Sequence, residues 1–163
     1  MTVTIRPATA GDADAVCEIH NQGIADRIAT LDDRLRSVDE VRAAISARGP
    51  RHPIVVADAE GRVVGWASLN QFNPRPVYDH VADFSVYVER GWRGRGIGRR
   101  LMEALIDLAR GAGYHKMVLA TLANNAVGIA LYARVGFTHV GVYREHGQLD
   151  GRWIDVVIME RMV

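Results

Sequence analysis

The sequence predicts one α/β domain built around a mixed sheet, and three observations lead to that fold class. Segments with apolar residues at every second position alternate with segments whose apolar residues recur every three to four positions. The resulting order is β-α-α-β-β-β-α-β-α-β-β, with no internal repeat or linker. At 163 residues, of which 48% are hydrophobic and 24% charged, the chain suits one core. We therefore expect a single domain over residues 1–163.

The first third of the chain predicts one strand followed by two helices. Residues 3–6 alternate as a short strand, and Thr9-Ala-Gly-Asp12 has the spacing of a capping box. An apolar stripe then predicts a helix over about residues 10–26. The mixed segment 27–36 is expected to be a loop. A second capping box, Ser37-Val-Asp-Glu40, begins a helix that ends before Gly49-Pro50.

Two strands and an exposed loop are predicted next. The apolar runs 53–58 and 62–69 are joined by Ala59-Glu60-Gly61, which is typical of a hairpin. Residues 70–79 carry two prolines and predict an exposed loop. Loops held by a rigid sheet often supply substrate contacts, so this loop is a candidate for that role.

The last third predicts a strand, a helix and a final pair of strands. Residues 116–121 form the strand, and Asn125 can cap a helix that stops at Gly136. The segments 137–143 and 153–159 predict two strands joined by a polar, glycine-rich connection. We expect these two strands to pair antiparallel.

The stretch from Asp83 to Arg110 organises the rest of the chain. Residues 84–88 alternate as a strand, and Ile97, Leu101, Leu105 and Leu108 recur at helical spacing. Between strand and helix lies the turn Arg93-Gly94-Arg95-Gly96-Ile97-Gly98. Glycines let a ligand approach the backbone, and a helix start leaves its first N–H groups unpaired. The turn therefore predicts an anion site suited to a phosphate or pyrophosphate.

Composition and motifs exclude several other classes. A formal net charge of +1 predicts no general attraction to nucleic acid or to a membrane surface. The single cysteine, Cys17, excludes an intramolecular disulfide, fits a reducing compartment and lies in a helical pattern that predicts a buried residue. Without a long apolar run at the N-terminus or elsewhere, we expect a soluble cytoplasmic protein.

The glycine turn fits none of the common nucleotide motifs. Counting from Gly94 and Gly96, Arg99 occupies the third glycine position of a dinucleotide fingerprint. A Walker A loop and a serine-nucleophile elbow are both missing from the sequence. The six histidines show no metal-ligand spacing, so we predict no metal.

The turn and its surroundings resemble the GCN5-related N-acetyltransferases. The segment 93–98 is similar to that family's Arg/Gln-x-x-Gly-x-Gly/Ala signature, and Asn125, Leu131-Tyr132 and Gly136-Phe137 follow at matching positions. The resemblance covers nearly the whole chain. It implies a mostly antiparallel central sheet flanked by helices, with the turn's N–H groups holding the pyrophosphate of acetyl-CoA.

A narrower resemblance is to phosphinothricin N-acetyltransferases. It rests on Arg75-Pro-Val-Tyr78, Ser85-Val-Tyr-Val88 and Gly151-Arg-Trp-Ile-Asp155. That subgroup includes enzymes for methionine sulfoximine and arsinothricin, which like phosphinothricin are amino acids with a tetrahedral polar head. The resemblance implies acetylation of an α-amino group as a detoxification or antibiotic-resistance activity, and a homodimer.

Catalytic roles follow from the needs of acetyl transfer and from the resemblance. Removing a proton from the ammonium requires a base, and Asp83 stands where the family carries an acidic residue. Flanked by Ala82 and Phe84, its carboxylate would be partly desolvated, which raises proton affinity. Tyr132 matches the family's general acid. The structural alternatives are a strand-end surface charge for Asp83 and a packed aromatic for Tyr132.

Binding roles are assigned in the same way. The strand implies backbone contacts to the pantetheine arm at Val86, Tyr87 and Val88, and the cofactor set further comprises Asn125 with Arg93, Gly94, Arg95, Gly96, Ile97, Gly98 and Arg99. Asn125 also has an ordinary role as a helix cap, and Arg99 as a solvated helix residue. For the acceptor we predict Arg75 and Tyr78, because a guanidinium grips an anion at two points, together with Thr30.

The sequence leaves two other functions open. In the first, the chain acetylates another small amine or a protein N-terminus. In the second, it binds acyl-CoA without catalysing a reaction. The presence of Asp83, Tyr132 and Asn125 together argues against the binding module. The sequence does not decide which amine is the acceptor.

Overall fold

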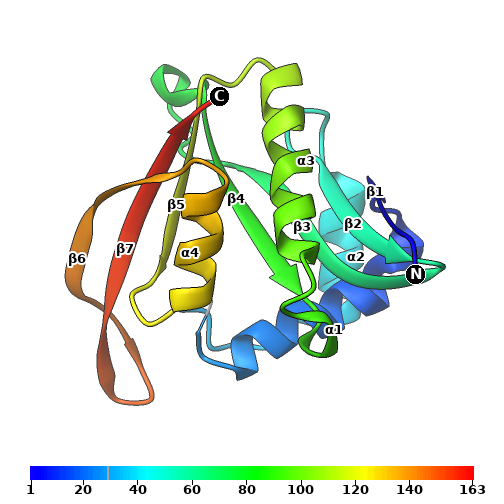
Figure 1. Cartoon of the computed structure of the whole chain (residues 1–163), viewed down its shortest axis with the longest axis horizontal. Coiled ribbons are helices and arrows are strands. Elements are labelled where there is room, and N and C mark those ends of the chain that lie inside the picture. The colour runs from blue at the N-terminus through cyan, green and yellow to red at the C-terminus, as the bar shows by residue number, and fades with distance from the viewer. Residues whose placement is uncertain (29) are drawn as a thin grey trace.

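A seven-stranded sheet with helices on both faces forms the molecule (Figure 1). The structure is a computed structural model that describes residues 1–28 and 30–163. The strands are β1 (Val3–Pro7), β2 (Ile54–Ala59), β3 (Arg62–Gln71), β4 (Val81–Val88), β5 (Lys116–Leu122), β6 (Thr138–Leu149) and β7 (Arg152–Met162). The α-helices are α1 (Ala13–Ala25), α2 (Val38–Ala47), α3 (Ile97–Gly111) and α4 (Ala126–Arg134). The predicted element order is confirmed.

The sheet has one parallel pair at its centre. The strand order is β1-β2-β3-β4-β5-β7-β6, and every neighbouring pair except β4–β5 is antiparallel. The pairing of β4 with β5 is short, because only Val81 with Lys116 and Ala82 with Met117 are in register. Beyond these residues the two strands separate, as Figure 1 shows. This split is the main irregularity of the sheet.

Two apolar clusters attach the helices to opposite faces. In Figure 1, α3 and α4 lie in front of the sheet and α1 and α2 lie behind it. On the front, Ile97, Leu101 and Leu105 of α3 are buried against β-strand residues. Leu108, which the sequence predicts to be buried, is 37% exposed. Leu108 lies at the margin of the apolar stripe of α3, and near the C-terminal end of this helix the buried residue is Ala109 instead.

The predicted caps form, with one refinement at the first helix. The Asp12 carboxylate accepts the Thr9 N–H at 2.8 Å and pairs with the Arg6 guanidinium, so residues 10–12 make a 3₁₀ turn before α1. Ser37 caps α2 by accepting the Glu40 N–H at 3.2 Å. Cys17 is buried, as predicted. No described helix has the length and apolar character needed to cross a membrane.

The final hairpin is longer than the sequence indicates. The prediction of a polar connection over residues 144–152 is wrong, because most of this segment continues β6. The chain turns only at Asp150-Gly151, where φ is 51° and 75°. β6 lies at the sheet edge and is exposed along nearly its whole length. Its sequence therefore lacks the alternation of apolar and polar residues that marks a half-buried strand. Register shifts between His139 and Gly141 and between Tyr143 and Gly147 further disturb its period.

Candidate active site

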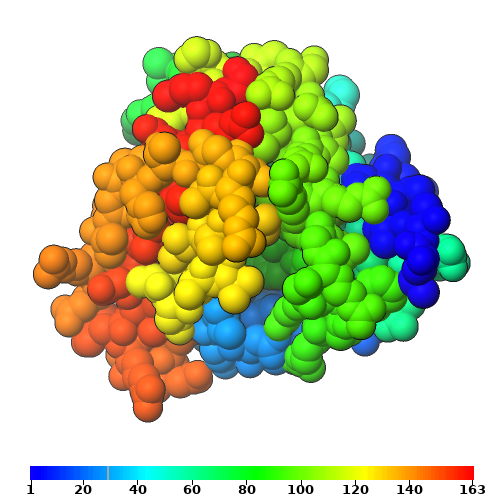
Figure 2. Space-filling view, in the orientation of Figure 1, coloured from blue at the N-terminus to red at the C-terminus, as the bar shows by residue number. Residues whose placement is uncertain are grey.

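The split between β4 and β5 contains a cavity of about 300 Å³. It passes from the loop after α1, through the gap between the strands, to the inner side of α4. Its wall combines Thr30, Leu31, Asp83, Phe84, Ser85, Val86, Tyr87, Leu119, Ala120, Thr121, Leu122, Tyr132 and Val156. Figure 2 shows a hollow on the front surface, between α4 and the start of α3 and above the chain after α1. The site therefore opens where the sheet is interrupted.

After Ala82, one edge of β4 offers backbone groups that no described strand uses. The Glu89 N–H donates to the Val64 carbonyl on β3. Because backbone N–H and C=O groups alternate between the two edges of a strand, those of Tyr87 and Ser85 also point toward β3. The backbone groups of Val86 and Val88 consequently point to the other edge, where β5 has already diverged. The Val88 carbonyl accepts the Arg93 Nε–H at 3.3 Å, which leaves Val86 free to pair with an extended ligand. Tyr87 instead packs its ring against Trp66, with centroids 5.1 Å apart.

The glycine turn leads into α3, and Gly94, Arg95 and Gly96 are exposed. Gly94 and Gly96 have φ of 77° and 82°, a left-handed conformation that glycine adopts without strain. The first helical hydrogen bond runs from the Arg100 N–H to the Gly96 carbonyl at 3.2 Å. Among the described residues, the N–H groups of Ile97, Gly98 and Arg99 have no partner. Together with the helix dipole, they form a cradle for an anion.

The third glycine of the turn serves the packing of two helices. A Cβ added to Gly98 would lie 3.0 Å from Cδ2 of Leu131 on α4, closer than side chains normally approach. Gly98 therefore allows α4 to approach the start of α3.

The arginines of the turn are engaged mainly with the protein itself. Arg93 pairs with Asp26 at the end of α1 at 2.7 Å, which ties the turn to the helix on the opposite face. The Arg95 guanidinium stacks over Trp92, 4.9 Å from the ring centroid, and Arg99 pairs with Glu103. Both Arg95 and Arg99 are exposed, so their contacts with cofactor phosphates stay predictions.

Asp83 is a partly buried carboxylate in the cavity wall. Its side chain accepts the Phe84 N–H at 2.6 Å, and it forms no ion pair with any other described residue. Burial raises the pKa of Asp83 above its ordinary value, with the Phe84 N–H opposing the shift. The predicted desolvation is confirmed. A carboxylate in this state binds a proton more readily than a surface aspartate does.

Tyr132 approaches the same cavity from the other face of the sheet. It comes from α4, is 9% exposed and meets Phe84 edge-on with ring centroids 5.7 Å apart. Burial raises the pKa of Tyr132, so the phenol keeps its proton at neutral and moderately alkaline pH. Its position across the split from Asp83 is compatible with proton donation, and its packing also fills the core.

Asn125 acts as the cap of α4. Its Oδ1 accepts the Gly128 N–H at 3.1 Å, and its Nδ2 donates to the Thr121 hydroxyl at 3.0 Å. A Cβ on Gly128 would collide with the Asn125 amide, so the two residues are closely fitted. Both ends of the amide are thus occupied by the protein. Its predicted contact with the cofactor stays a prediction.

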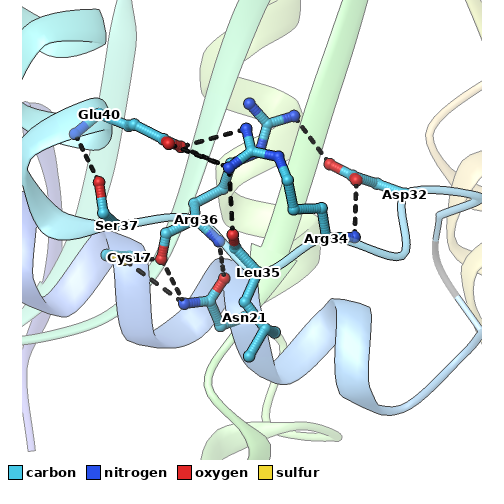
Figure 3. Close-up of polar contacts among 8 residues, drawn as sticks. All are labelled: Cys17, Asn21, Asp32, Arg34, Leu35, Arg36, Ser37 and Glu40. Atoms are coloured by element: carbon cyan, nitrogen blue, oxygen red, sulfur yellow. Dashed lines mark hydrogen bonds and ion pairs between the residues drawn. The ribbon is translucent and has the colours of Figure 1, made fainter.

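The loop between α1 and α2 is held in place by a polar network (Figure 3). Asn21 on α1 accepts the Arg36 N–H at 2.9 Å and donates to the Arg36 carbonyl at 3.0 Å. The Arg36 guanidinium pairs with Asp32, and Arg34 pairs with Glu40 on α2. Thr30 accepts the Asp32 N–H at 3.1 Å and lines the cavity. The network therefore holds Thr30 in the cavity wall, and the acceptor role of Thr30 stays a prediction.

Arg75 and Tyr78 lie outside the wall of this cavity. Both belong to the exposed loop between β3 and β4, where residues 76–78 form a 3₁₀ turn. The Tyr78 ring packs edge-on against Phe72, with centroids 5.7 Å apart. The described chain does not bring these two side chains together with Asp83, and their acceptor role stays a prediction.

Other wall residues were missed by sequence reasoning. Ser85 carries a detectable signal, since it shares the strand face of Asp83 at a spacing of two. Thr121 and Val156 have none, because β5 and β7 reach the cavity only through long-range pairing. Among the residues that the structure describes, no group of three or more His, Cys, Asp or Glu side chains is placed to hold a metal.

Comparison with known proteins identifies the family. Residues 18–137 match the model of the acetyltransferase (GNAT) family, which is most of the chain and includes the glycine turn and α4. The chain belongs to the GNAT acetyltransferase family. It is accordingly an N-acetyltransferase, and the unpaired edge of β4 and the cradle at α3 are parts of a GNAT fold.

Relatives of this GNAT protein include named enzymes. An L-methionine sulfoximine/L-methionine sulfone acetyltransferase from Pseudomonas paraeruginosa is 35% identical over 98% of this chain and 94% of its own length. A phosphinothricin N-acetyltransferase from Streptomyces coelicolor is 31% identical over 98% of this chain and 95% of its own. A phosphinothricin acetyltransferase structure from Sinorhizobium meliloti in complex with acetyl-CoA aligns with a TM-score of 0.94 at 31% identity, over 100% of this chain and 89% of that one.

Proposed function

We propose that this GNAT protein transfers the acetyl group of acetyl-CoA to the α-amino group of phosphinothricin-like amino acids. Phosphinothricin, methionine sulfoximine and arsinothricin are the acceptors of this class. The observation that carries the proposal is the split between β4 and β5, where the unpaired edge of β4 and the Asp83 carboxylate line one cavity. The anion cradle follows β4 in the chain, at the start of α3. The named relatives and the acetyl-CoA complex of a structural neighbour support it.

The residues present fit acetyl-CoA. The N–H groups of Ile97, Gly98 and Arg99 would receive its pyrophosphate, since they are unpaired among the described residues and lie at a helix start. The pantetheine arm would extend along β4 in place of the missing strand partner. There the N–H of Val86 would polarise the thioester carbonyl.

The acid–base pair acts from opposite sides of the split. Asp83 takes the proton of the acceptor ammonium, directly or through a water, because its raised pKa makes it a better base than a surface aspartate. The neutral amine then attacks the thioester in a ternary complex. Tyr132 donates its proton to the leaving thiolate, since burial keeps the phenol protonated until that step.

The acceptor enters on the side of the loop after α1. Thr30 supplies a hydroxyl at the cavity wall. Arg75 and Tyr78 supply an anion grip and an orienting hydrogen bond from the loop before β4. We also place the enzyme in the cytoplasm as a homodimer, with exposed apolar residues on β6, Val140 and Val142, as candidate contacts between copies.

Release of free thiol from acetyl-CoA by the purified protein tests the proposal. The panel contains phosphinothricin, methionine sulfone, other small amines and a peptide with a free N-terminus. We expect turnover with the first two and product masses that correspond to one added acetyl group. Turnover confined to another amine or to the peptide would replace the acceptor class. Tight CoA binding without turnover on any amine would leave a binding module.

A further inference from the structure

A second and larger cavity of about 570 Å³ lies on the back of the sheet, between β2, β3, β4 and the helices α1 and α2. Its lining combines apolar side chains, such as Val16 and Ile45, with the polar side chains of Arg48, His52, Asn70 and Ser85. Such a combination of an apolar wall and a few convergent polar groups is typical of a small-molecule site.

Arg48 is the unusual member of this wall. It follows the last turn of α2 and is half-buried, and its Nη1 donates to the Leu69 carbonyl at 2.8 Å and to Asn70 Oδ1 at 2.9 Å. Neither acceptor is charged, and no described carboxylate pairs with this guanidinium. Burial accordingly lowers its pKa. An arginine that is partly removed from water is stabilised by an anionic partner, and the remaining donors of the half-buried Arg48 are available for one.

No other ionisable group among the described lining residues offers an unpaired positive charge to an anion. Glu40 and Arg36 also line the cavity but are already paired, Glu40 with Arg34 at 3.0 Å and Arg36 with Asp32 at 2.8 Å (Figure 3). Burial lowers the pKa values of the His20 and His52 side chains, so both imidazoles are neutral near pH 7. Arg48 is thus the one unpaired permanent charge among the described lining residues.

A chain of hydrogen bonds connects Arg48 with the catalytic side of β4. The Asn70 amide accepts from Arg48 through Oδ1 and donates to the Ser85 hydroxyl through Nδ2 at 3.0 Å. Ser85 lines both cavities, and Asn70 lies directly opposite Asp83 in the register of β3 and β4. The two cavities therefore share Ser85, which lies two residues from the proposed base on the same face of β4.

We propose that the larger cavity receives the side chain of the acceptor amino acid and that Arg48 binds an anionic group at its end. With the α-amino group at Asp83, the side chain passes Ser85 and reaches the free donors of Arg48. The favoured acceptors are then amino acids with a phosphinate or carboxylate head, because a neutral head would leave the guanidinium without its partner. This inference rests on the proposed function and specifies its acceptor.

A comparison of two acceptors in Arg48 variants tests the inference. Phosphinothricin has an anionic tetrahedral head, and methionine sulfone has a neutral one. We expect Arg48→Gln to raise the KM for phosphinothricin more than tenfold and to leave the KM values for methionine sulfone and acetyl-CoA within about twofold. Arg42→Gln is the matched control, since Arg42 lies on α2, shortly before Arg48, and among the described residues pairs only with the exposed Asp39. A variant that alters both acceptors equally would show Arg48 to be a structural clamp.

Binding measured without turnover separates this inference from the proposed function. Calorimetric titration of phosphinothricin into the protein saturated with CoA is expected to weaken more than tenfold in Arg48→Gln. If no amine is acetylated but this loss is seen, the acceptor site stands and the proposed reaction fails. Unchanged phosphinothricin binding in a folded variant overturns the inference. Should Arg48→Gln not fold, Arg48→Lys decides, because losing the two-point grip must still lower phosphinothricin binding selectively.

Discussion

Replacing Asp83 with Asn separates the role of this carboxylate in catalysis from its role in the fold. The amide keeps the size of the side chain and an oxygen that accepts the Phe84 N–H, so the local structure is retained. What disappears is the group that removes a proton from the acceptor. We therefore expect a large loss of turnover without a loss of folded structure.

Asp83→Asn is expected to lower the rate of acetyl transfer and to raise the stability of the fold. A positioned general base contributes about 10²–10⁴ in rate, which corresponds to about 3–5 kcal/mol in the barrier. Because burial raises the pKa of Asp83 in the folded state, the folded chain holds the proton more tightly than the unfolded chain. The free energy of unfolding then falls as pH rises from the pKa of Asp83 in the unfolded chain through its higher pKa in the folded chain. The fall is about 1.4 kcal/mol for each unit by which the two pKa values differ. Asn carries no such cost, so the variant is expected to be more stable at neutral pH.

The assay follows thiol release at saturating acetyl-CoA between about pH 5 and pH 9, with thermal unfolding measured on the same samples. Wild-type kcat/KM is expected to fall on the acid side as Asp83 takes up a proton, and the variant is expected to lose this limb. Asp107→Asn, an exposed position on α3, is the control. An Asp83→Asn variant with full turnover and an unchanged pH profile would refute the assignment.

Three further substitutions probe the rest of the site. Tyr132→Phe is expected to lower kcat at least tenfold with little change in the KM for acetyl-CoA, and full turnover would reduce Tyr132 to a packing residue. Gly96→Ala places an L residue at φ 82°, which costs about 1 kcal/mol and should weaken acetyl-CoA binding in a calorimetric titration; unchanged affinity would contradict the cradle. Gly23→Ala brings a Cβ within 2.7 Å of the Tyr87 ring, so we expect about 1–3 kcal/mol of destabilisation in thermal unfolding, and an unchanged Tm would show that the ring moves freely.

The element order and the glycine turn were predictable because their signals are local. Periodicity, capping boxes and the residues around Gly96 each act within one or two turns of chain. The raised pKa of Asp83 was predicted from its apolar sequence neighbours Ala82 and Phe84, but in the strand these two side chains point to the opposite face. The burial that raises the pKa therefore comes from other segments of the chain.

The remaining features depend on pairing between distant segments. The split of the sheet arises because β5 pairs with β4 over two residues and with β7 over its full length, which no local pattern encodes. The length of β6 was missed because an exposed edge strand tolerates polar residues. Arg48 gave no signal, because its proposed role depends on its hydrogen bond to Asn70, which lies 22 residues further along the chain.

The most direct test of the account is a crystal structure with acetyl-CoA bound. We expect the pyrophosphate oxygens within hydrogen-bonding distance of the N–H groups of Ile97, Gly98 and Arg99, and the thioester carbonyl at the N–H of Val86. The acetyl carbon is expected between Asp83 and Tyr132. A cofactor bound outside the split, with the β4 edge still unpaired, would contradict the account.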